Sequence, residues 1–367
     1  MNLDSAMQLA PVLFSNSYLE ARQKFLGAAP TSKAYACSAK GPSGEVLFTD
    51  VAYFGNPEAK RLLVLVSGTH GAEGYCGSAA QLSLIHAKFH EQLPSSTAVL
   101  CIHALNCYGF AWDRRATAEG CDLNRNYIDF SKPPPSNPGY EELADHFIPA
   151  DLSEERLRVA EDAIATYRSV HGDEKMLTAR MSGQYTRPGG LYYGGSEPTE
   201  ARRLLERIAK DFDIATRGQV VIVDYHTGFG PYGYGELQCV QASGAAGYER
   251  AVNIFGPSVT SPDLGNMTNV VIHGSQGEFW QRILRDRHTY VNLEFGTYRH
   301  ERGAKVVRDE HWLFMHRPEA ADSELGRQIR NACKLYFCPD RLDWKEMILW
   351  RSHLVHRQAL EALLTSE

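Results

Sequence analysis

The sequence predicts an α/β fold with a largely parallel or mixed central sheet. Four near-continuous apolar runs are typical of strands buried on both faces: Arg61–Ser67, Thr97–His103, Gln219–Tyr225 and Thr289–Phe295. Segments with helical spacing of apolar residues lie between and after these runs. Buried strands that alternate with helices indicate a layered domain. We therefore expect a three-layer α/β/α sandwich.

The first elements of the chain carry local signals for one helix and one strand. Ser17, followed three residues later by Glu20, resembles a capping box, which predicts a helix through about Ala28. Glu45–Tyr53 alternates between apolar and polar residues as a strand does. After the first buried run, a glycine-rich turn leads into a predicted helix at about Tyr75–Phe89.

The segment at about 132–218 is predicted to be an insertion of loops and helices. It begins with the proline-rich KPPPSNP at 132–138, and two helices, near 152–170 and 199–212, flank the glycine-rich RPGGLYYGG at 187–195. The tail at about 321–365 is predicted to form covering helices, because apolar residues recur there at helical spacing. These residues are Leu325, Ile329, Ala332, Tyr336, Met347, Trp350 and Leu354. We expect residues 1–367 to form a single domain, since each piece carries apolar residues that need a surface to bury against.

Composition and charge exclude several classes of protein. With 43% hydrophobic and 22% charged residues, the 367-residue chain is neither disordered nor fibrous. Its net charge of −6 provides no dense basic face for nucleic acid or for a membrane surface, so we expect neither partner. No apolar stretch approaches the ~20 residues of a membrane helix, and the start of the chain is a poor secretory signal. The eight cysteines form no CxxC pair and favour reduced thiols, so we expect a cytoplasmic protein.

Polar residues follow the buried runs directly. In an open α/β sheet, ligands bind in the crevice outside the carboxyl ends of the strands. Four separate segments would therefore bring polar groups to one edge of the sheet. These groups are His70 and Glu73 in GTHGAEG, then Asn106, Arg114, Arg115 and the run CDLNRN at 121–126, then His226, and finally Glu294.

A zinc site is predicted at this edge. The His-x-x-Glu pattern is weak alone, because it also occurs at His171–Glu174 and His316–Glu319, but only His70 and Glu73 follow a buried strand. A catalytic zinc ion keeps three protein ligands and one water, and His70, Glu73 and His226 supply a His₂Glu set. Taken alone, His226 would be interpreted as a hydrogen-bonded structural histidine. We expect one zinc ion per chain.

Glu294 is the candidate general base. A water molecule on zinc needs a carboxylate to accept its proton, and an acid within TYVNLEFG would be costly to bury unpaired. The alternative interpretation is a salt bridge from Glu294 to a nearby arginine such as Arg299. Planar donors suited to a carboxylate and to a developing oxyanion come from Asn124, Arg125 and either Arg114 or Arg115.

With these residues in place, the chain resembles the zinc carboxypeptidase family and, in the same clan, the aspartoacylase/succinylglutamate desuccinylase deacylases. It is most similar to a bacterial branch of that clan whose domain is catalogued as of unknown function. The resemblance is carried, in order, by GTHGAEG, DLNRNY, GLYYGG, DYHTGFGPYG and NLEFGTY, which spread over about 65–300. It implies a zinc-carboxypeptidase-like sandwich.

The resemblance also implies roles for individual residues. Matched by position, the zinc ligands are His70, Glu73 and His226, and the general base is Glu294. Asp122 matches the acid that orients the first zinc histidine. Spacing does not choose between two candidates for the arginine that polarises the carbonyl, although we favour Arg115. The remaining matches are Arg114 as the other candidate, and Asn124 with Arg125 as the carboxylate clamp.

One departure concerns the substrate. Carboxypeptidases place a mobile tyrosine roughly two dozen residues ahead of the general base, yet this chain has no tyrosine between Tyr248 and Tyr290. His273 is the nearest polar aromatic residue in that stretch. The peptide-binding mode of the family is therefore in question, and the substrate is either a peptide or a small molecule with a carboxylate.

Three classes of function follow. We expect a zinc-dependent hydrolase of an amide bond next to a free carboxylate, either a carboxypeptidase or an N-acyl amino acid deacylase. A non-enzymatic binding protein on the same fold is less favoured, because the ligands and the base are all present. A dinucleotide-binding oxidoreductase, indicated by GFGPYG at 228–233, is disfavoured because the following sequence is strand-like and no suitably placed acid follows. The sequence leaves the oligomeric state open.

Overall fold

The computed structural model describes residues 3–365, with side chains described from residue 8 onward. The strands are β1 (Lys33–Lys40), β2 (Val46–Gly55), β3 (Arg61–Val66), β4 (Thr97–His103), β5 (Gln219–Tyr232), β6 (Gly235–Gln238) and β7 (His288–Gly296). The helices are α1 (Leu3–Leu13), α2 (Tyr18–Ala28), α3 (Gly74–His86), α4 (Cys107–Ala111), α5 (Pro138–Phe147), α6 (Glu154–His171), α7 (Asp173–Met181), α8 (Glu200–Asp211), α9 (Ala246–Phe255), α10 (Gln276–Leu284), α11 (His300–His316), α12 (Glu324–Phe337) and α13 (Leu342–Thr365).

The seven strands form one mixed sheet in the order β1-β2-β4-β3-β5-β7-β6. The four central strands, β4, β3, β5 and β7, run parallel to one another. The strands at the two edges pair antiparallel, β1 with β2 and β2 with β4 on one side, and β6 with β7 on the other. The carboxyl ends of the central strands therefore meet at a single edge, as the sequence predicts.

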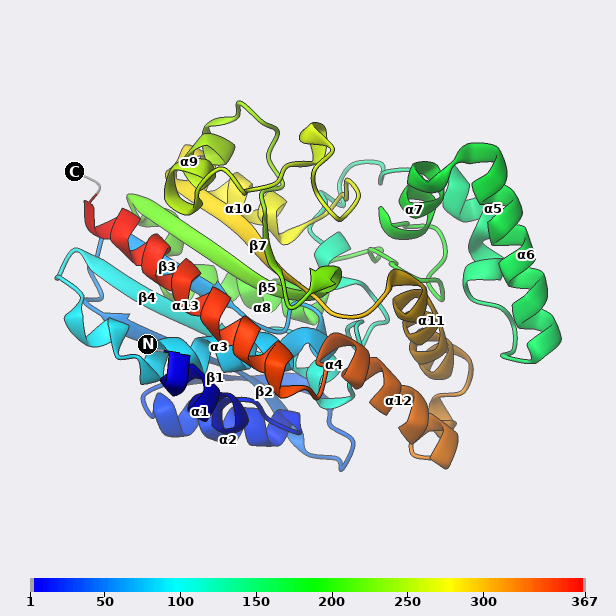
Figure 1. Cartoon of the computed structure of the whole chain (residues 1–367), viewed down its shortest axis with the longest axis horizontal. Coiled ribbons are helices and arrows are strands. Elements are labelled where there is room, and N and C mark those ends of the chain that lie inside the picture. Colours follow the sequence, from blue (N-terminus) through cyan, green and yellow to red (C-terminus); the bar gives the residue numbers. More distant parts are fainter. Residues whose placement is uncertain (1–2, 366–367) are drawn as a thin grey trace.

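Both faces of the sheet are covered by helices. Along β3, Leu63 and Leu65 pack with α3 and α13 on one face, while Leu62, Val64 and Val66 pack with α8 and α10 on the other. This alternation explains why the strand reads as a continuous apolar run, since successive side chains enter opposite cores. In Figure 1, α13 crosses in front of the sheet and α8 lies behind it. The predicted three-layer α/β/α arrangement is confirmed.

A third apolar cluster lies beyond the sheet. It joins α5 to α11 and α12, with Phe147, Trp312 and Tyr336 among its buried members. Figure 1 shows α5, α6 and α7 gathered at one end of the molecule, next to α11. Helix α8 belongs to the same stretch of sequence at about 132–218, yet it packs directly on the sheet through Leu205 and Ile208.

Most of the expected elements form close to their expected bounds. Ser17 caps α2 by accepting from the Glu20 amide at 3.2 Å, although the Glu20 carboxylate accepts from Asn16 rather than from Ser17. The tail is helical, but part of its expected buried face is wrong. Leu325, Met347 and Trp350 are exposed, whereas their neighbours in the same helices, such as Ile329 and Leu349, are buried. Helices α12 and α13 therefore turn a different side towards the core than the spacing of their apolar residues predicts.

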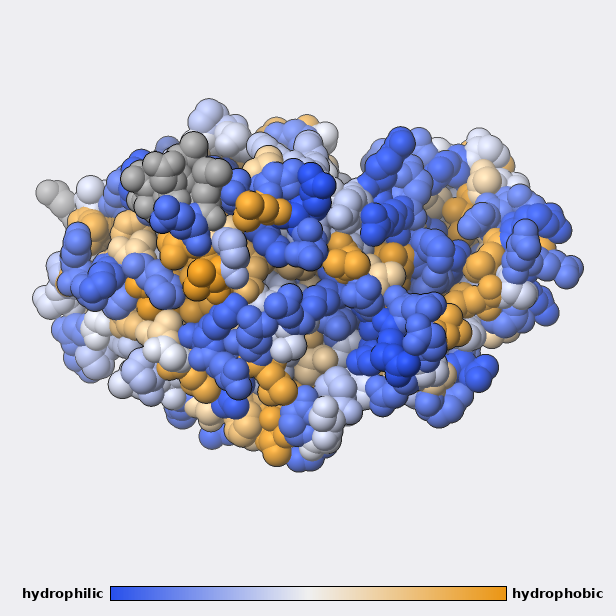
Figure 2. Space-filling model, turned by 60° about the horizontal axis from the view of Figure 1, so that its bottom comes forward, coloured by the Kyte–Doolittle hydropathy of each residue, from blue (hydrophilic) through white to orange (hydrophobic). Residues whose placement is uncertain are grey.

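The surface and the cysteines agree with the composition. Figure 2 shows one face on which hydrophilic residues predominate and hydrophobic residues form smaller groups. Within residues 3–365, no helix has the length and apolarity to cross a membrane. All eight cysteines are free thiols.

The segment 228–233 continues strand β5 to Tyr232, so no helix opens at its third glycine, as a dinucleotide site would require.

Candidate functional site

The candidate site lies at the carboxyl edge of the parallel strands. Val66, at the end of β3, pairs with Ile102 of β4 and with Asp224 of β5. Two residues further along β5, His226 is paired in register with Glu294 of β7. The short 3-10 helix η1 (Gly71–Glu73) follows β3 directly and continues into α3. Segments that are far apart in the sequence therefore bring their polar side chains to one place.

His70, Glu73 and His226 converge, and all three are buried. His70 Nδ1 lies 2.9 Å from Glu73 Oε1, and His226 Nδ1 lies 3.0 Å from Glu73 Oε2. The two Nδ1 atoms are 3.3 Å apart. One ligand atom from each residue lies within 4.8 Å of the others, so the three side chains can hold a single metal ion.

The far side of each imidazole faces an aspartate. His70 Nε2 is 3.0 Å from Asp122 Oδ1, and His226 Nε2 is 3.0 Å from Asp224 Oδ2. The Asp122 contact is a hydrogen bond, whereas the Asp224 contact has ion-pair distance without hydrogen-bond alignment. The negative charge of each aspartate favours a proton on the ring nitrogen that faces it and leaves the other nitrogen as a ligand, an arrangement common around metal-binding histidines. The donor set of two Nδ1 atoms and one carboxylate therefore fits a divalent metal such as zinc.

Asp224 was not singled out in the sequence. Its Oδ1 accepts from Thr69 Oγ1 at 2.8 Å, and its Oδ2 from Tyr290 Oη at 3.1 Å. Both bonds hold the carboxylate in place against His226. The available signal was its position two residues before His226, because residues i and i+2 of a strand lie on the same face.

The site cluster, formed by His70, Glu73, His226, Asp122 and Asp224, is buried. Burial and the charges nearby shift the pKa values of two of its acids. Burial disfavours the ionised form of Glu73, but His70 and His226 outweigh this effect and hold its pKa below the usual range. Burial likewise opposes ionisation of Asp122, but Arg115, His70 and Arg125 lower its pKa well below the usual value. Both carboxyl groups are thus held ionised, as a metal ligand and its supporting acid require.

Glu294 lies on β7 beside the three candidate ligands. Burial raises its pKa to about 8, and the negative charge of Glu73 adds to the rise. Its Oε1 accepts a hydrogen bond from the amide of Phe229 at 3.0 Å. Arg299, the partner in the alternative interpretation, is almost fully exposed and lies 4.0 Å from Glu301. A cation held by the neighbouring candidate ligands would lower this pKa and favour the ionised carboxylate that a general base requires.

The two consecutive arginines point to different places. Arg115 Nη1 donates to Glu73 Oε1 at 2.8 Å, and its Nη2 donates to Asp122 Oδ2 at 3.1 Å. Arg114 instead donates to buried Glu310 at 2.8 Å, and its guanidinium stacks on Phe314. Arg115 lies in the cluster and Arg114 lies outside it.

Asn124 and Arg125 are buried next to the cluster. Arg125 donates through Nε and Nη2 to Met181 O, and through Nη1 to Asn124 O. These bonds use three of the five N–H donors of a guanidinium and leave two for an anion. Asn124 Oδ1 accepts from the amide of Gln276 at 2.8 Å, so the other side of its amide presents the Nδ2 donor.

Tyr192 is a second residue that the sequence did not single out. Its ring centroid lies 5.4 Å from the guanidinium carbon of Arg115 and 5.7 Å from that of Arg125. Its φ of 54° is in the left-handed region, which is uncommon for a residue other than glycine and is found at functional loops. The GLYYGG segment was the available signal. His273, the polar aromatic that the sequence offered, is exposed.

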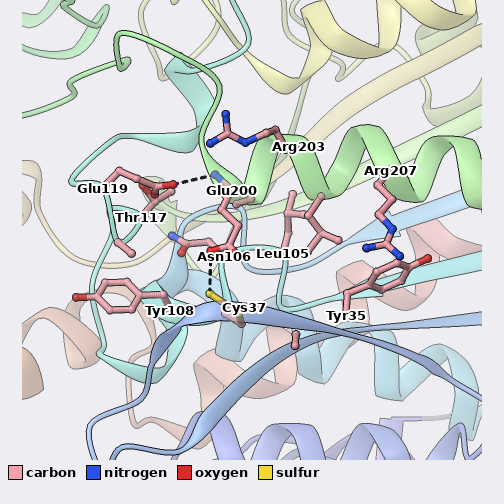
Figure 3. A pocket seen from close by; sticks show the side chains of 15 residues that line it. Tyr35, Cys37, Leu105, Asn106, Tyr108, Thr117, Glu119, Glu200, Arg203 and Arg207 are labelled. Carbon is pink, nitrogen blue, oxygen red and sulfur yellow. Dashed lines mark hydrogen bonds between the residues drawn. The ribbon is translucent and has the colours of Figure 1, made fainter.

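Asn106 supports the backbone near the site and is not one of the side chains that converge in the cluster. It caps α4 by accepting from the Gly109 amide at 2.9 Å, and its Nδ2 donates to Ala116 O at 3.1 Å. It also lines a cavity of about 220 Å³ between β1, α4 and α8, into which Cys37 and Glu200 project (Figure 3). Asn106 therefore supports the backbone that carries Arg115.

Comparison with solved structures finds chains of low sequence identity and partial structural similarity. Carboxypeptidase A from Helicoverpa armigera is 13% identical, with a TM-score of 0.42 over 91% of this chain and 81% of that chain. Succinylglutamate desuccinylase from Chromobacterium violaceum is 14% identical, with a TM-score of 0.37 over 89% and 76%. An aspartoacylase family protein from Mesorhizobium loti is 13% identical, with a TM-score of 0.38 over 78% and 66%, so this chain spans slightly less than two thirds of its length.

Sequence comparison adds one family and no characterised relative. No curated protein sequence matches this chain. One family profile matches residues 14–351, which is nearly the whole chain. The chain therefore belongs to the family described as "Protein of unknown function (DUF2817)".

Proposed function

We propose that this chain is a zinc-dependent hydrolase that cleaves an amide bond next to a free carboxylate, as a carboxypeptidase does. The observation that carries the proposal is the convergence of His70 Nδ1, Glu73 and His226 Nδ1, with Glu294 on the neighbouring strand. Two imidazole nitrogens and one carboxylate are the ligands of many catalytic zinc sites, which keep one position open. One ion per chain would fill this site.

The roles of the chain's own residues follow from their contacts. A bound zinc ion supplies Lewis acidity and lowers the pKa of water towards neutrality. Glu294 Oε1 is fixed by the Phe229 amide, so we assign proton transfer to Oε2, which takes a proton from water and returns it to the leaving nitrogen. Arg115 would hold the scissile carbonyl oxygen. The two remaining donors of Arg125, with Asn124, would hold the substrate carboxylate.

A second candidate is an N-acyl amino acid deacylase of the aspartoacylase type. Its support is the depth of the site, since His70, Glu73, His226 and Glu294 are each no more than 4% exposed. Tyr192 also stacks on the two arginines that would receive the substrate. A small acyl amino acid fits such a site more readily than a peptide chain does. In either case we place the protein in the cytoplasm, where its eight thiols stay reduced.

Replacing the proposed base tests the mechanism directly. Glu294→Gln keeps the shape of the side chain but removes its ability to accept a proton. We expect the variant to retain about one zinc per chain by elemental analysis and to lose roughly 10²–10⁴-fold in kcat. Unchanged turnover in Glu294→Gln would remove Glu294 from the reaction.

A matched control stands on the adjacent strand. Glu236 of β6 is paired in register with Glu294, is also buried, and accepts from Thr260 Oγ1 at 2.6 Å. Glu236→Gln should retain both zinc and turnover, because its carboxylate faces the Thr260 segment rather than the candidate ligands. An equal loss in both variants would indicate general damage to the fold.

The substrate class requires a separate measurement. Zinc-loaded protein should be screened against matched sets of C-terminal peptides and N-acyl amino acids, with kcat/KM measured for each. Faster hydrolysis of peptides would support the carboxypeptidase proposal, and faster hydrolysis of short acyl amino acids would support the deacylase. Absence of hydrolysis in both sets, in protein that binds zinc, would favour the non-enzymatic binding protein.

A further inference from the structure

A cavity lined by basic side chains lies at the opposite end of the sheet from the candidate site. It has a volume of about 390 Å³ and is bordered by the starts of β3 and β5, helix α9 and the segment before β7. Four cations line it, Lys60, Arg61, Arg250 and Arg287, together with a single acid, Asp286. The lining therefore carries a net positive charge in a chain whose overall charge is −6.

The four cations have no carboxylate within ion-pair distance in the part of the chain from residue 8 to 365. Ion pairs are common elsewhere, for example Arg158 with Asp162 at 3.1 Å and Arg327 with Glu324 at 3.0 Å. An unpaired group of like charges is electrostatically unfavourable unless water or an anion screens it.

Backbone carbonyls fix three of the guanidinium groups in place. Arg61 Nη1 donates to Leu363 O at 3.1 Å, Arg250 Nη2 to His288 O at 2.5 Å, and Arg287 Nη1 to Arg217 O at 2.6 Å. Each of these bonds uses one of the five N–H donors of a guanidinium group, so most donors of each arginine are left for a ligand. Fixed side chains lose little further entropy when an anion binds.

Arg250 lies in an electrostatically unfavourable environment. Burial lowers its pKa, and Asp286 offsets only part of the shift. Its Nε atom is buried and has no hydrogen-bond partner. A bound anion would offset the uncompensated positive charge of this guanidinium group.

We propose that this cavity binds a small phosphate-bearing anion through Lys60, Arg61, Arg250 and Arg287. Guanidinium forks match phosphate oxygens in pairs, and four cations suit a ligand with two negative charges, which is the charge of a phosphate monoester. The volume lies within the range of small-molecule sites. The six residues of β3 separate the cavity from the loop that carries His70 by roughly 20 Å, so its ligand would not compete with the substrate.

Isothermal titration calorimetry on the full chain, with inorganic phosphate and with glycerol phosphate as separate probes, tests this proposal. We expect binding of at least one probe and a rise in Tm with probe concentration. Arg287→Gln and Arg250→Gln should each weaken binding by about tenfold or more, because each removes charge-assisted donors. Stronger binding of glycerol phosphate would identify a phosphorylated metabolite as the ligand, and stronger binding of inorganic phosphate would identify the free ion.

Two control variants show whether binding depends on this cavity. Arg156→Gln removes one arginine charge from α6, far from the cavity, and should bind both probes as the unmodified chain does. His226→Ala should also retain binding, which keeps the result independent of the proposed zinc site. The proposal is overturned if neither probe binds, if Arg156→Gln weakens binding as much as Arg287→Gln, or if His226→Ala abolishes it. Far-UV circular dichroism confirms that each variant is folded.

Discussion

Asp122 and Asp224 hold the two candidate metal-binding histidines from behind. Each carboxylate lies 3.0 Å from an Nε2 atom and is itself tied to the surrounding structure, Asp122 by Arg115 and Asp224 by Thr69 and Tyr290. The position of Nδ1 in each ring therefore depends on residues that do not touch the metal ion. Such supporting acids fix both the ring and its tautomer.

Asp224→Asn should weaken metal binding without unfolding the protein. The amide can still contact His226 but lacks the charge that keeps the proton on Nε2, so we expect about 10–100-fold lower zinc affinity. Competition with a chromogenic chelator measures this change. Asp113→Asn is a suitable control, because Asp113 is a comparable acid that accepts from Tyr75 at 2.6 Å, away from the cluster. Equal zinc affinity in Asp224→Asn and the unmodified chain would contradict the role of Asp224.

The residues that the sequence could predict are those whose neighbours in the chain carried a signal. His70, Glu73, His226 and Glu294 each follow or end an apolar run, so the strand pattern placed them at one edge. The sequence does not mark Asp224 and Tyr192, because their importance depends on which side chains face them across the fold. The choice between Arg114 and Arg115 depends on the backbone direction at two adjacent positions, which spacing does not contain.

At the scale of elements, the packing of η1 against α4 positions two of the candidate ligands. Gly71 lies between His70 and Glu73, and a Cβ atom at Gly71 would be 1.9 Å from the backbone carbon of Gly109. The same atom would be 2.2 Å from the amide nitrogen of Phe110. Because both contacts are with backbone, no side-chain rotation can relieve them.

Gly71→Ala should therefore displace η1 and lower the zinc content. We expect a loss of about 1–3 kcal/mol in the free energy of unfolding, as for other overpacked sites. Denaturant titration and elemental analysis measure the two effects. Gly27→Ala is the control, since nothing lies within 4 Å of its Cβ position in α2, and it should stabilise the protein by about 0.5–1 kcal/mol. Full zinc content and normal stability in Gly71→Ala would show that η1 tolerates the shift.

The elements differ in how readily the sequence reveals them. The central strands are apolar on both faces, and their pattern is therefore continuous and easily recognised. Strand β1 is absent from the elements predicted from the sequence, because KAYACSAK is largely exposed and lies at the edge of the sheet. In α12 and α13 the helices were evident, but the buried side was not, since exposed Leu325 and Met347 belong to the same apolar pattern as their buried neighbours.

At the scale of the whole molecule, buried neutral histidines predict sensitivity to acid. Burial lowers the pKa of His103, His311 and His356 to about 3 in the folded chain, whereas an unfolded histidine titrates near 6.5. The unfolded state therefore binds more protons between these values. The stability that these residues contribute is fully present above pH ~6.5 and is lost as the pH falls towards 3.

The free energy of unfolding should thus fall steeply below about pH 6. Each of the three histidines contributes up to about 1.4 kcal/mol per pH unit in that window. Urea titrations at a series of pH values measure the slope. His103→Phe, at a position stacked on Phe25, should reduce the slope by up to about 1.4 kcal/mol per pH unit, the share of one such histidine. A slope that is unchanged in this variant would exclude His103 from the acid response.

The order of the strands also governs when the site can first exist during synthesis. His70 and Glu73 leave the ribosome just after β3. Strand β5, which lies beside β3 in the sheet, follows more than a hundred residues later, and β7 later still. A nascent chain holds only two of the three candidate ligands until His226 has emerged, and it has no Glu294 until most of the protein is made. Metal capture, and any hydrolysis, would therefore be late events in the life of each molecule, so an incomplete chain cannot act on its surroundings.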